Sequence, residues 1–175
     1  THSFFRKQNF YHVHTPIITA ADCEGAGEQF TVTLHNPESK KPYVASEDFF
    51  GKKTHLTVSG QLNAECLAMG LGRVYTFGPT FRAEPSTTPK HAAEFWMLEP
   101  EAAFYTLKDN IKLATDYLAY VISHVLDNCK TEFNFFEKWI EPEIKKTLSS
   151  VIDNNFEVIT YTEAVNALLQ SGQKF

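Results

Sequence analysis

The sequence lacks the features by which several protein classes are recognised. No apolar run approaches the roughly 20 residues that a membrane-spanning helix requires, so we expect no membrane association. The three cysteines, Cys23, Cys66 and Cys129, are an odd number and form no CxxC pair, which argues against a disulfide framework or a zinc knuckle. Neither of the two common glycine-rich phosphate-binding loops is present. A nucleotide site would therefore need other residues.

Positive charge is also scarce. The chain of 175 residues has 16 basic and 21 acidic residues and a net charge of −5. This excludes binding of nucleic acid through bulk charge, although a local basic groove stays compatible with it. Hydrophobic residues make up 43% and include 15 Phe, enough to bury a core in one compact domain or in a large part of one. The cysteine usage predicts a reducing compartment, either the cytoplasm or an organelle.

Most predicted strands precede the predicted helices along the chain. Compact or alternating apolar runs predict strands over residues 13–18, 30–34, 56–58, 73–79, 80–84 and 94–101. Residues 43–50 are predicted as a further strand or a loop. Helical spacing predicts the tail of a helix within residues 1–11 and helices over 60–69, 107–129, 142–151 and 164–171. Ser59 is predicted to cap the first complete helix, and a capping box at Thr160 opens the last. This order predicts an α+β fold with a mostly antiparallel sheet.

The strands at 80–84 and 94–101 are predicted to form a wide hairpin with a polar surface. Because strand side chains alternate between faces, Arg82 shares a face with Glu84, and Phe95 shares one with Met97 and Glu99. If both sets face the same side, a guanidinium group could bind a phosphate or carboxylate and Phe95 could stack on a purine. The alternative is a structural ion pair between Arg82 and Glu84 or Glu99. Spacing alone leaves both interpretations open.

Four blocks of sequence, in order, resemble a known family. Phe81-Arg82-Ala83-Glu84 and Glu94-Phe95-Trp96-Met97-Leu98-Glu99-Pro100-Glu101 resemble motif 2 of class II aminoacyl-tRNA synthetases, over about residues 80–101. Residues 4–19, which include Val13-His14-Thr15-Pro16, resemble motif 1. Residues 22–28 resemble the loop that closes over the amino acid, and residues 56–62 resemble the strand-to-helix turn of the amino-acid pocket. Within the class, the blocks are most similar to asparaginyl enzymes of the bacterial type.

The resemblance implies that residues 1–175 are a partial class II catalytic core, a mostly antiparallel sheet flanked by helices. Motif 3 and an anticodon-binding OB-fold are expected outside this chain, so we expect the chain alone to be inactive or very weak. The implied reaction joins asparagine and ATP into asparaginyl-adenylate and then transfers asparagine to tRNA(Asn). ATP is a substrate, and the ligands of Mg²⁺ are expected outside this chain.

The resemblance also implies roles in ATP binding. Arg82 would be the catalytic residue that bridges the α-phosphate and the substrate carboxylate. Glu84 would hold the adenine amino group, and Phe95 would stack on the adenine ring. The other residues implied in ATP binding are Ala83, Lys90, His91 and Ala92. Lys90 departs from the family pattern, where an Arg is expected, because a lysine lacks the bidentate fork.

For the amino acid, Glu24 and Gln61 match the positions that hold the substrate α-amino group, with Ser59 nearby and Glu99 a further candidate. Aspartyl enzymes carry a Lys where this chain has Ala64, and Glu65 follows it on nearly the same helical face as Gln61. We therefore expect Ala64 and Glu65 to set the preference for asparagine, with Glu65 accepting a hydrogen bond from the side-chain amide and repelling aspartate.

The implied partners are asparagine, ATP, tRNA(Asn) and a second copy of the chain. The homodimer would form through the motif 1 region, with Val13 and Pro16 at the interface. Three alternatives remain: an aspartate-activating enzyme like asparagine synthetase, an enzyme like aspartyl-tRNA synthetase, and a dimerising paralogue without catalysis. Asparagine synthetase-like enzymes lack an anticodon domain, and a non-catalytic paralogue would have lost motif residues such as Arg82 or Glu84.

Overall fold

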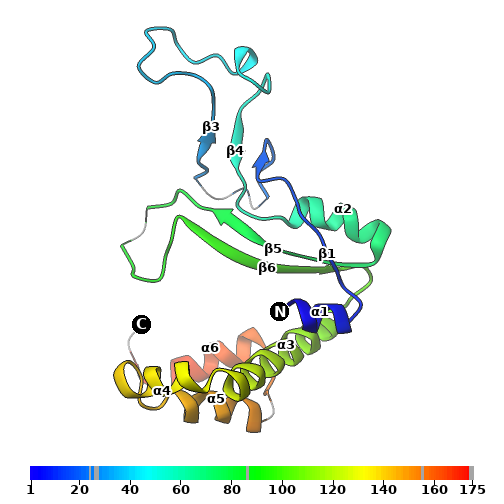
Figure 1. Cartoon of the computed structure of the whole chain (residues 1–175), viewed down its shortest axis with the longest axis vertical. Helices are drawn as coiled ribbons and strands as arrows, with labels where there is room; N and C mark the ends of the chain where they lie inside the picture. Colours follow the sequence, from blue (N-terminus) through cyan, green and yellow to red (C-terminus); the bar gives the residue numbers. More distant parts are fainter. Residues whose placement is uncertain (24, 26–27, 86, 155, 174–175) are drawn as a thin grey trace. The chain divides into compact units, whose positions relative to one another are not determined.

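The computed structural model describes residues 1–23, 25, 28–85, 87–154 and 156–173. The chain divides into two compact units, Thr1–Tyr105 and Thr106–Phe175, which are described separately (Figure 1). Unit 1 contains all the described strands, and unit 2 contains helices. The predicted α+β class is therefore confirmed, with the strands first and most of the helices after them. No helix in the described part of the chain is long and apolar enough to cross a membrane.

A hairpin of two long strands dominates unit 1. Strand β5 (Arg73–Phe81) pairs antiparallel with β6 (Glu94–Ala102) along the whole length of both. The short strand β1 (Tyr11–His12) adds a parallel edge to β5, which gives the order β1-β5-β6. The loop between β5 and β6 is the predicted long connection of the hairpin (Figure 1).

A second small sheet lies earlier in the same unit. It has the antiparallel order β2-β4-β3, with β2 (Ile18–Thr19), β4 (Thr54–Leu56) and β3 (Thr31–Val32). Strand β3 is shorter than the predicted 30–34, and β4 begins and ends two residues before the predicted 56–58. Residues 43–50 contain no described strand; they form a loop with one turn of 3₁₀ helix, η1 (Ala45–Glu47).

The prediction of a single strand over residues 13–18 is wrong. Strand β1 ends at His12 and β2 begins at Ile18, and the two belong to different sheets. The Val13 amide still donates to the Tyr75 carbonyl in the first sheet (3.0 Å), whereas the Ile17 carbonyl accepts from Thr57 beside the second (2.8 Å). Pro16 lies between them and has no amide hydrogen, so neither ladder can continue through it. The chain therefore crosses from one sheet to the other here.

The prediction of separate strands over residues 73–79 and 80–84 is also wrong, because β5 runs without a break through Gly78 and Pro79 to Phe81. The Tyr75 carbonyl accepts from the Val13 amide, and the Phe81 amide donates to the Thr57 carbonyl (2.9 Å). The backbone N–H and C=O groups of every second residue of β5, counted from Tyr75 to Phe81, therefore point away from β6. Pro79 is one of these residues. Its nitrogen, which carries no hydrogen, points away from β6, so the absent N–H removes no hydrogen bond between β5 and β6.

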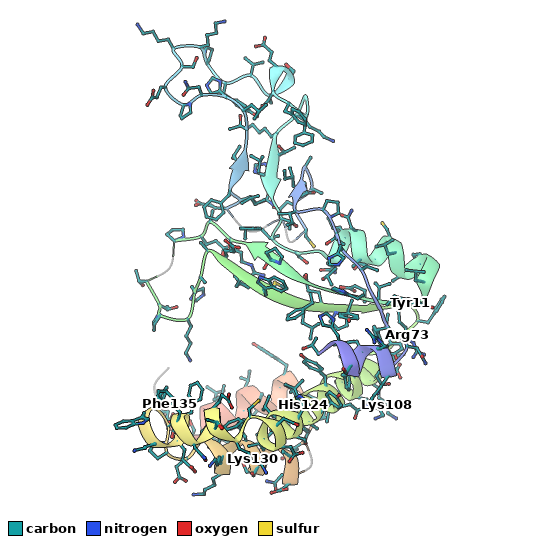
Figure 2. The ribbon with its side chains drawn as sticks, viewed as in Figure 1. Tyr11, Arg73, Lys108, His124, Lys130 and Phe135 are labelled. Carbon is teal, nitrogen blue, oxygen red and sulfur yellow. The ribbon has the colours of Figure 1, made fainter. Side chains whose placement is uncertain are left out.

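Helices α1 (His2–Lys7) and α2 (Gln61–Leu71) pack on opposite faces of β5. On one face, Val74 is fully buried against Ala64 and Ala68 of α2. On the other, the Tyr75 ring stacks on Phe5 of α1 with centroids 4.5 Å apart. Neighbouring residues of one strand thus anchor two helices, as the alternation of strand side chains requires. Figure 2 shows Tyr11 and Arg73 in this part of unit 1.

The described residues of unit 2 form four helices. They are α3 (Leu107–Asn128), α4 (Lys130–Trp139), α5 (Ile144–Asp153) and α6 (Tyr161–Gln170). The capping box predicted at Thr160 is confirmed, because its hydroxyl accepts from the Glu163 amide while Glu163 accepts from the Thr160 amide. Helix α4 was not predicted from the sequence. It carries Phe135, an exposed aromatic side chain labelled in Figure 2, and its N-cap, Cys129, makes no side-chain hydrogen bond.

The aromatic packing of α1 leads to a stability prediction. Phe5 is 1% exposed and contacts the rings of Phe4, Phe10 and Tyr75. We expect Phe5→Ala to lower the free energy of unfolding by about 3–5 kcal/mol, because it removes a buried ring and leaves a cavity. Urea unfolding followed by circular dichroism measures this change. Phe104, 98% exposed in the same unit, is the control, and Phe104→Ala should change stability by no more than about 0.5 kcal/mol. Equal losses in both variants would contradict this account.

Candidate functional site

The register of the hairpin places several polar residues of β5 and β6 on one face. Thr76 lies opposite Glu99, and Thr80 lies opposite Phe95. Arg82 follows Thr80 by two residues, and its amide donates to the Ala93 carbonyl at 3.0 Å, so the chain stays paired just beyond the strands. Arg82 therefore shares a face with Phe95, and with Glu99 further along, which meets the condition that the alternation alone left open.

An open cavity of about 580 Å³ lies at the loop end of this face. Its lining comprises Arg82, Glu84, Lys90, His91, Ala92, Ala93 and Phe95. Six of the seven residues predicted to bind ATP are thus brought together. Ala83 does not line the cavity; its amide donates to the Glu28 carbonyl at 2.9 Å, which ties the end of β5 to the chain beyond β2. Residue Ala93 was not predicted, and its place follows from the pairing with Arg82.

Arg82 lies over the aromatic ring in this cavity. Its guanidinium carbon is 5.4 Å from the Phe95 ring centroid, and its Nη2 is 4.0 Å from the Met97 sulfur. Such a cation–π contact contributes roughly 0.5–1 kcal/mol at an exposed site. Nearby, the His91 ring is held by a hydrogen bond with the Thr88 hydroxyl. The cavity therefore combines a guanidinium group, a flat aromatic face and a carboxylate from Glu84.

A second group of polar side chains gathers where β6 faces the start of α2. Gln61 is the first residue of the helix, and its amide Nε2 donates to Glu65 Oε1 at 2.8 Å. The Cys23 thiol donates to Gln61 Oε1 at 3.5 Å. Glu24 lies outside the described residues. Ala64 is fully buried against Val74 in the core, so the structure does not bring it to this group.

Glu99 connects the two strands to the start of the helix. Its carboxylate accepts from the Ser59 hydroxyl, from the Gly60 amide at 3.1 Å and from the Thr76 hydroxyl at 3.0 Å. The prediction that Ser59 is the N-cap is wrong, because the N-cap is Gly60. Ser59 Oγ instead accepts a hydrogen bond from the Gln61 amide at 3.0 Å. Sequence reasoning missed Thr76, because only the register of β5 with β6 places it opposite Glu99.

Glu101 lies one alternate position beyond Glu99 on β6. Burial raises the pKa of Glu101 from 4.5 to about 7, and the charges of Glu65 and Glu99 add to the effect. Three carboxylates thus approach one another where β6 meets α2. A carboxyl group in such surroundings keeps its proton to near-neutral pH.

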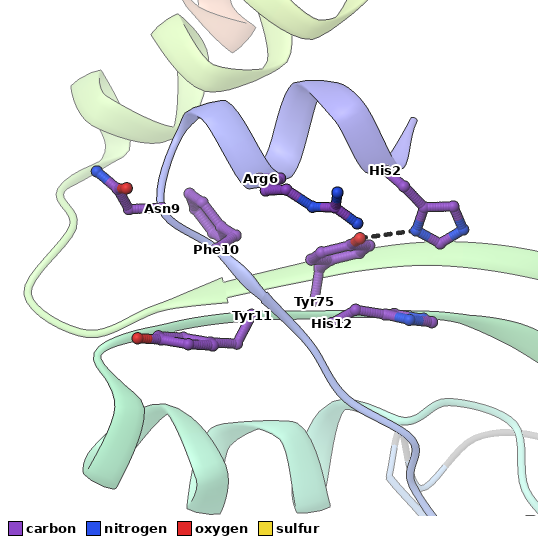
Figure 3. Close-up of a pocket in the computed structure, with 7 residues that line it drawn as sticks. All are labelled: His2, Arg6, Asn9, Phe10, Tyr11, His12 and Tyr75. Carbon is purple, nitrogen blue, oxygen red and sulfur yellow. Dashed lines mark hydrogen bonds between the residues drawn. The ribbon is translucent and has the colours of Figure 1, made fainter.

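The predicted dimer residues lie near the free edge of β1. Val13 packs against the core between α2 and β5, whereas Pro16 is exposed. An open cavity of about 500 Å³ lies beside this edge. Figure 3 shows Arg6 and His2 of α1, which extend towards Tyr75. A 2.7 Å hydrogen bond joins His2 Nδ1 to the Tyr75 hydroxyl.

His12 lies at this edge between two other histidines. Its ring centroid is 4.8 Å from that of His2 and 4.6 Å from that of His14. Burial lowers the pKa of His12, and the neighbouring charges of His14 and His2 lower it further, against a raising contribution from a backbone hydrogen bond at Phe77. Within the described ranges, no group of three or more His, Cys, Asp or Glu residues could hold a metal ion.

Comparison with proteins of known sequence identifies relatives over the whole chain. Asparagine–tRNA ligase of Clostridium beijerinckii is 54% identical over 179 residues, and the match covers 99% of this chain and 39% of that protein. Asparagine–tRNA ligase of Protochlamydia amoebophila is 51% identical over 182 residues, covering 100% of this chain and 38% of that protein. The chain thus spans about two fifths of the length of these relatives.

Solved structures lead to the same family. The crystal structure of asparaginyl-tRNA synthetase from Pyrococcus horikoshii complexed with asparaginyl-adenylate superposes with a TM-score of 0.79 at 29% identity, over 99% of this chain and 35% of that one. The family model described as tRNA synthetases class II (D, K and N) matches residues 1–174. Together with the polar face of the β5–β6 hairpin, these matches establish that the chain belongs to the class II tRNA synthetases of the D, K and N family.

Proposed function

We propose that this chain forms part of a catalytic domain that activates asparagine with ATP and transfers it to tRNA(Asn). One observation carries the proposal: a single face of the β5–β6 hairpin has the Arg82 cavity at one end and the polar group around Gln61 and Glu65 at the other. ATP and an amino acid bound at these two places would meet along β6. The relatives named asparagine–tRNA ligase support the choice of substrate.

In the first step, a carboxylate oxygen of asparagine attacks the α-phosphorus of ATP. A bond from that oxygen to phosphorus forms, the bond to the oxygen bridging the α- and β-phosphates breaks, and pyrophosphate leaves. The protein's task is to position the two substrates and to neutralise charge. Arg82 can do both, because its planar fork can bind the carboxylate and the α-phosphate together. In the second step, a hydroxyl oxygen of the terminal ribose of the tRNA attacks the carbonyl carbon and loses its proton to solvent. The bond from that carbon to the phosphate oxygen breaks, and AMP leaves with that oxygen.

ATP entry requires Arg82 to change its partner. The guanidinium group now lies over the Phe95 ring, on which the adenine would stack. We propose that the ring exchanges a cation–π contact for adenine stacking, while Arg82 moves to the phosphate. Glu84 accepts a hydrogen bond from the adenine amino group, and the loop residues Lys90 and His91 contact the phosphates. Magnesium would neutralise phosphate charge when bound, and we propose that its ligands lie outside the described residues.

Selection of asparagine over aspartate follows from the charges around α2. Glu65 is exposed, and the Gln61 amide already donates to it. We propose that its carboxylate accepts a hydrogen bond from the amide of asparagine. Aspartate would instead bring a further negative charge beside the carboxylates of Glu65 and Glu99. Ala64, buried and neutral, supplies no cation to offset that charge, so an aspartate-activating enzyme is disfavoured.

The remaining parts of the proposal concern partners and compartment. A second copy of the chain would pair along the free edge of β1, near Val13 and Pro16, since an unpaired strand edge favours association. The tRNA substrate follows from the reaction. We propose that the protein acts in the cytoplasm or in an organelle that makes protein.

Arg82 provides the first test. In the full-length protein, we expect Arg82→Lys to lower kcat/KM for asparagine-dependent pyrophosphate exchange by about 100-fold or more, because a lysine cannot bind two groups through a planar fork. Arg73 is a matched control at the other end of β5, where its guanidinium lies over the Tyr105 ring. Arg73→Lys should leave exchange within about threefold of wild type. Similar losses in both variants would show that Arg82 has no special part in the reaction.

Glu65 provides a test of selectivity. We expect Glu65→Gln to reduce the preference for asparagine over aspartate by about 10- to 100-fold, because the repulsion of the second carboxylate is weakened. The measurement compares kcat/KM for pyrophosphate exchange with each amino acid. Glu94, an exposed acid at the start of β6, serves as the control through Glu94→Gln. An unchanged ratio in the Glu65 variant would refute its role as the reader of the amide.

The raised pKa of Glu101 predicts a pH-dependent contribution to stability. Between pH 4.5 and about 7, the folded state keeps a proton that the unfolded state releases, so stability falls as pH rises through this window. Glu101→Gln removes the ionisable group. Relative to wild type, the variant should therefore gain thermal stability as pH rises, and the gain should level off above about pH 7. Calorimetric Tm values across this range test the prediction, and a difference that does not vary with pH would contradict it.

A further inference from the structure

We propose that residues 33–53, here called the arm, bind the phosphate backbone of the tRNA through their lysine side chains. The arm joins β3 to β4 and contains two pairs of lysines, Lys40-Lys41 and Lys52-Lys53. The inference rests on the proposed function, because the candidate site must receive the end of a tRNA. The sequence motifs assign no role to these four lysines.

The arm is anchored on both sides of Arg82. The Phe81 amide donates to the carbonyl of Thr57, the residue after β4, at 2.9 Å. The Ala83 amide donates to the carbonyl of Glu28, which precedes β3, at 2.9 Å. Phe81 and Ala83 are the two neighbours of Arg82 in the chain. The segment that carries the arm thus starts and ends beside the residue proposed to bind the α-phosphate.

The pairing of β3 with β4 extends this anchorage outward. Val32 of β3 lies opposite Thr54 of β4, and the Thr54 hydroxyl donates to the Val32 carbonyl at 3.0 Å. Beyond this pair, the arm continues away from the β5–β6 hairpin (Figure 1). When the terminal ribose of a tRNA reaches the Arg82 cavity, the nucleotides that precede it would therefore lie within reach of the arm.

Hydrogen bonds within the arm hold its two legs together. The Asp48 carboxylate accepts from the Leu34 amide at 3.1 Å and from the Phe49 amide at 2.8 Å. In the outer part of the arm, the Ser39 hydroxyl accepts from the Lys41 amide at 3.1 Å. A segment that is already ordered loses less conformational entropy when it binds, so its lysines are better placed to contact phosphates than those of a flexible loop.

The lysines of the arm are available to a partner. All four side chains are exposed, and none of them forms an ion pair with a described residue. The arm contains only three acids, Glu38, Glu47 and Asp48, so it carries an excess of positive charge in a chain whose net charge is −5. A positive projection on an acidic protein favours a polyanion at this place and disfavours it over the rest of the surface.

The third lysine pair of the chain differs from the two in the arm. Lys145 lies 2.7 Å from Glu137, and Lys146 lies 2.6 Å from Glu143. The charges of this pair are therefore balanced by neighbouring carboxylates. The structure thus distinguishes lysine pairs that the sequence alone makes equivalent.

Exposed aromatic rings lie next to the second lysine pair of the arm. Phe49 is 72% exposed and Phe50 is 46% exposed, and only Gly51 separates them from Lys52. Rings beside lysines are the combination by which proteins bind single-stranded nucleic acid, because the rings stack on unpaired bases while the ammonium groups contact phosphates. These rings favour a nucleic acid over a simple anion as the partner of the arm.

The combined substitution Lys40→Ala and Lys41→Ala in the full-length protein tests the inference. We expect it to weaken binding of tRNA(Asn) about tenfold at about 0.1 M salt and to reduce the slope of log Kd against log salt concentration by about 2, because two phosphate contacts are lost. KM for tRNA(Asn) in aminoacylation should rise by a similar factor. Lys40→Arg with Lys41→Arg keeps both charges and should bind within about threefold of wild type.

The matched control is Lys145→Ala with Lys146→Ala. It removes the same charge from lysines that are paired with carboxylates, so the affinity for tRNA(Asn) and its salt slope should stay at their wild-type values. Equal effects of the two double variants would overturn the inference, because net charge and not the arm would then determine binding. An unchanged affinity and salt slope in the Lys40 and Lys41 variant would overturn it as well.

Pyrophosphate exchange separates this inference from the proposed function, since the first step uses only asparagine and ATP. A loss of exchange in the Lys40 and Lys41 variant that matches its loss of aminoacylation would also overturn the inference, because the arm would then affect the shape of the site and not the tRNA. Absence of asparagine-dependent exchange in the wild-type protein would refute the proposed function instead.

Discussion

The antiparallel register of β5 with β6 is the constraint on which the rest of the structure depends. It places Thr76 opposite Glu99 and Thr80 opposite Phe95, which puts polar side chains on the same face of the hairpin as the Phe95 ring. A slip of one residue would send Phe95 and Glu99 to the other face. The same pairing therefore fixes the cavity around Arg82 and the link to α2 at once.

Strand β5 also separates the two helices of unit 1, which pack on its opposite faces. Val74 faces α2, and the next residue, Tyr75, faces α1, so the core is divided between the two sides of one strand. The side with α2 carries the polar site, and the side with α1 carries the aromatic packing. Between them, Gly60 lets the turn before α2 approach Thr76 closely. Apolar packing thus sets the frame, and the Glu99 carboxylate connects that frame to the start of α2.

Local patterns in the sequence were sufficient for the features that depend on neighbouring residues. The hairpin strands, helix α3 and the capping box at Thr160 follow from spacing along one element, whereas the shared face of Arg82 and Phe95 is fixed only by the register of β5 with β6. Features that depend on pairing between distant segments were missed. The passage of the chain from one sheet to the other at Pro16 reflects hydrogen bonds to Tyr75 and Thr57, which lie far along the sequence.

In the candidate site, too, the residues that depend on local sequence were predicted, and those that depend on pairing between distant segments were not. Residues of the Arg82 cavity could be predicted because they lie within one motif, whereas the role of Thr76 depends on its register with β6. Ala64, expected at the pocket, packs into the core because α2 turns that position towards Val74. The α4 helix was missed, and the lack of a side-chain cap does not explain this, because α5 also lacks one and was predicted.

The central claim is that the polar face of the hairpin receives ATP and asparagine side by side. Pyrophosphate exchange by the wild-type full-length protein, with asparagine and with aspartate in parallel, tests it most directly. The account predicts exchange that depends on asparagine and is at least about 100-fold weaker with aspartate. Exchange that depends on aspartate alone would contradict it.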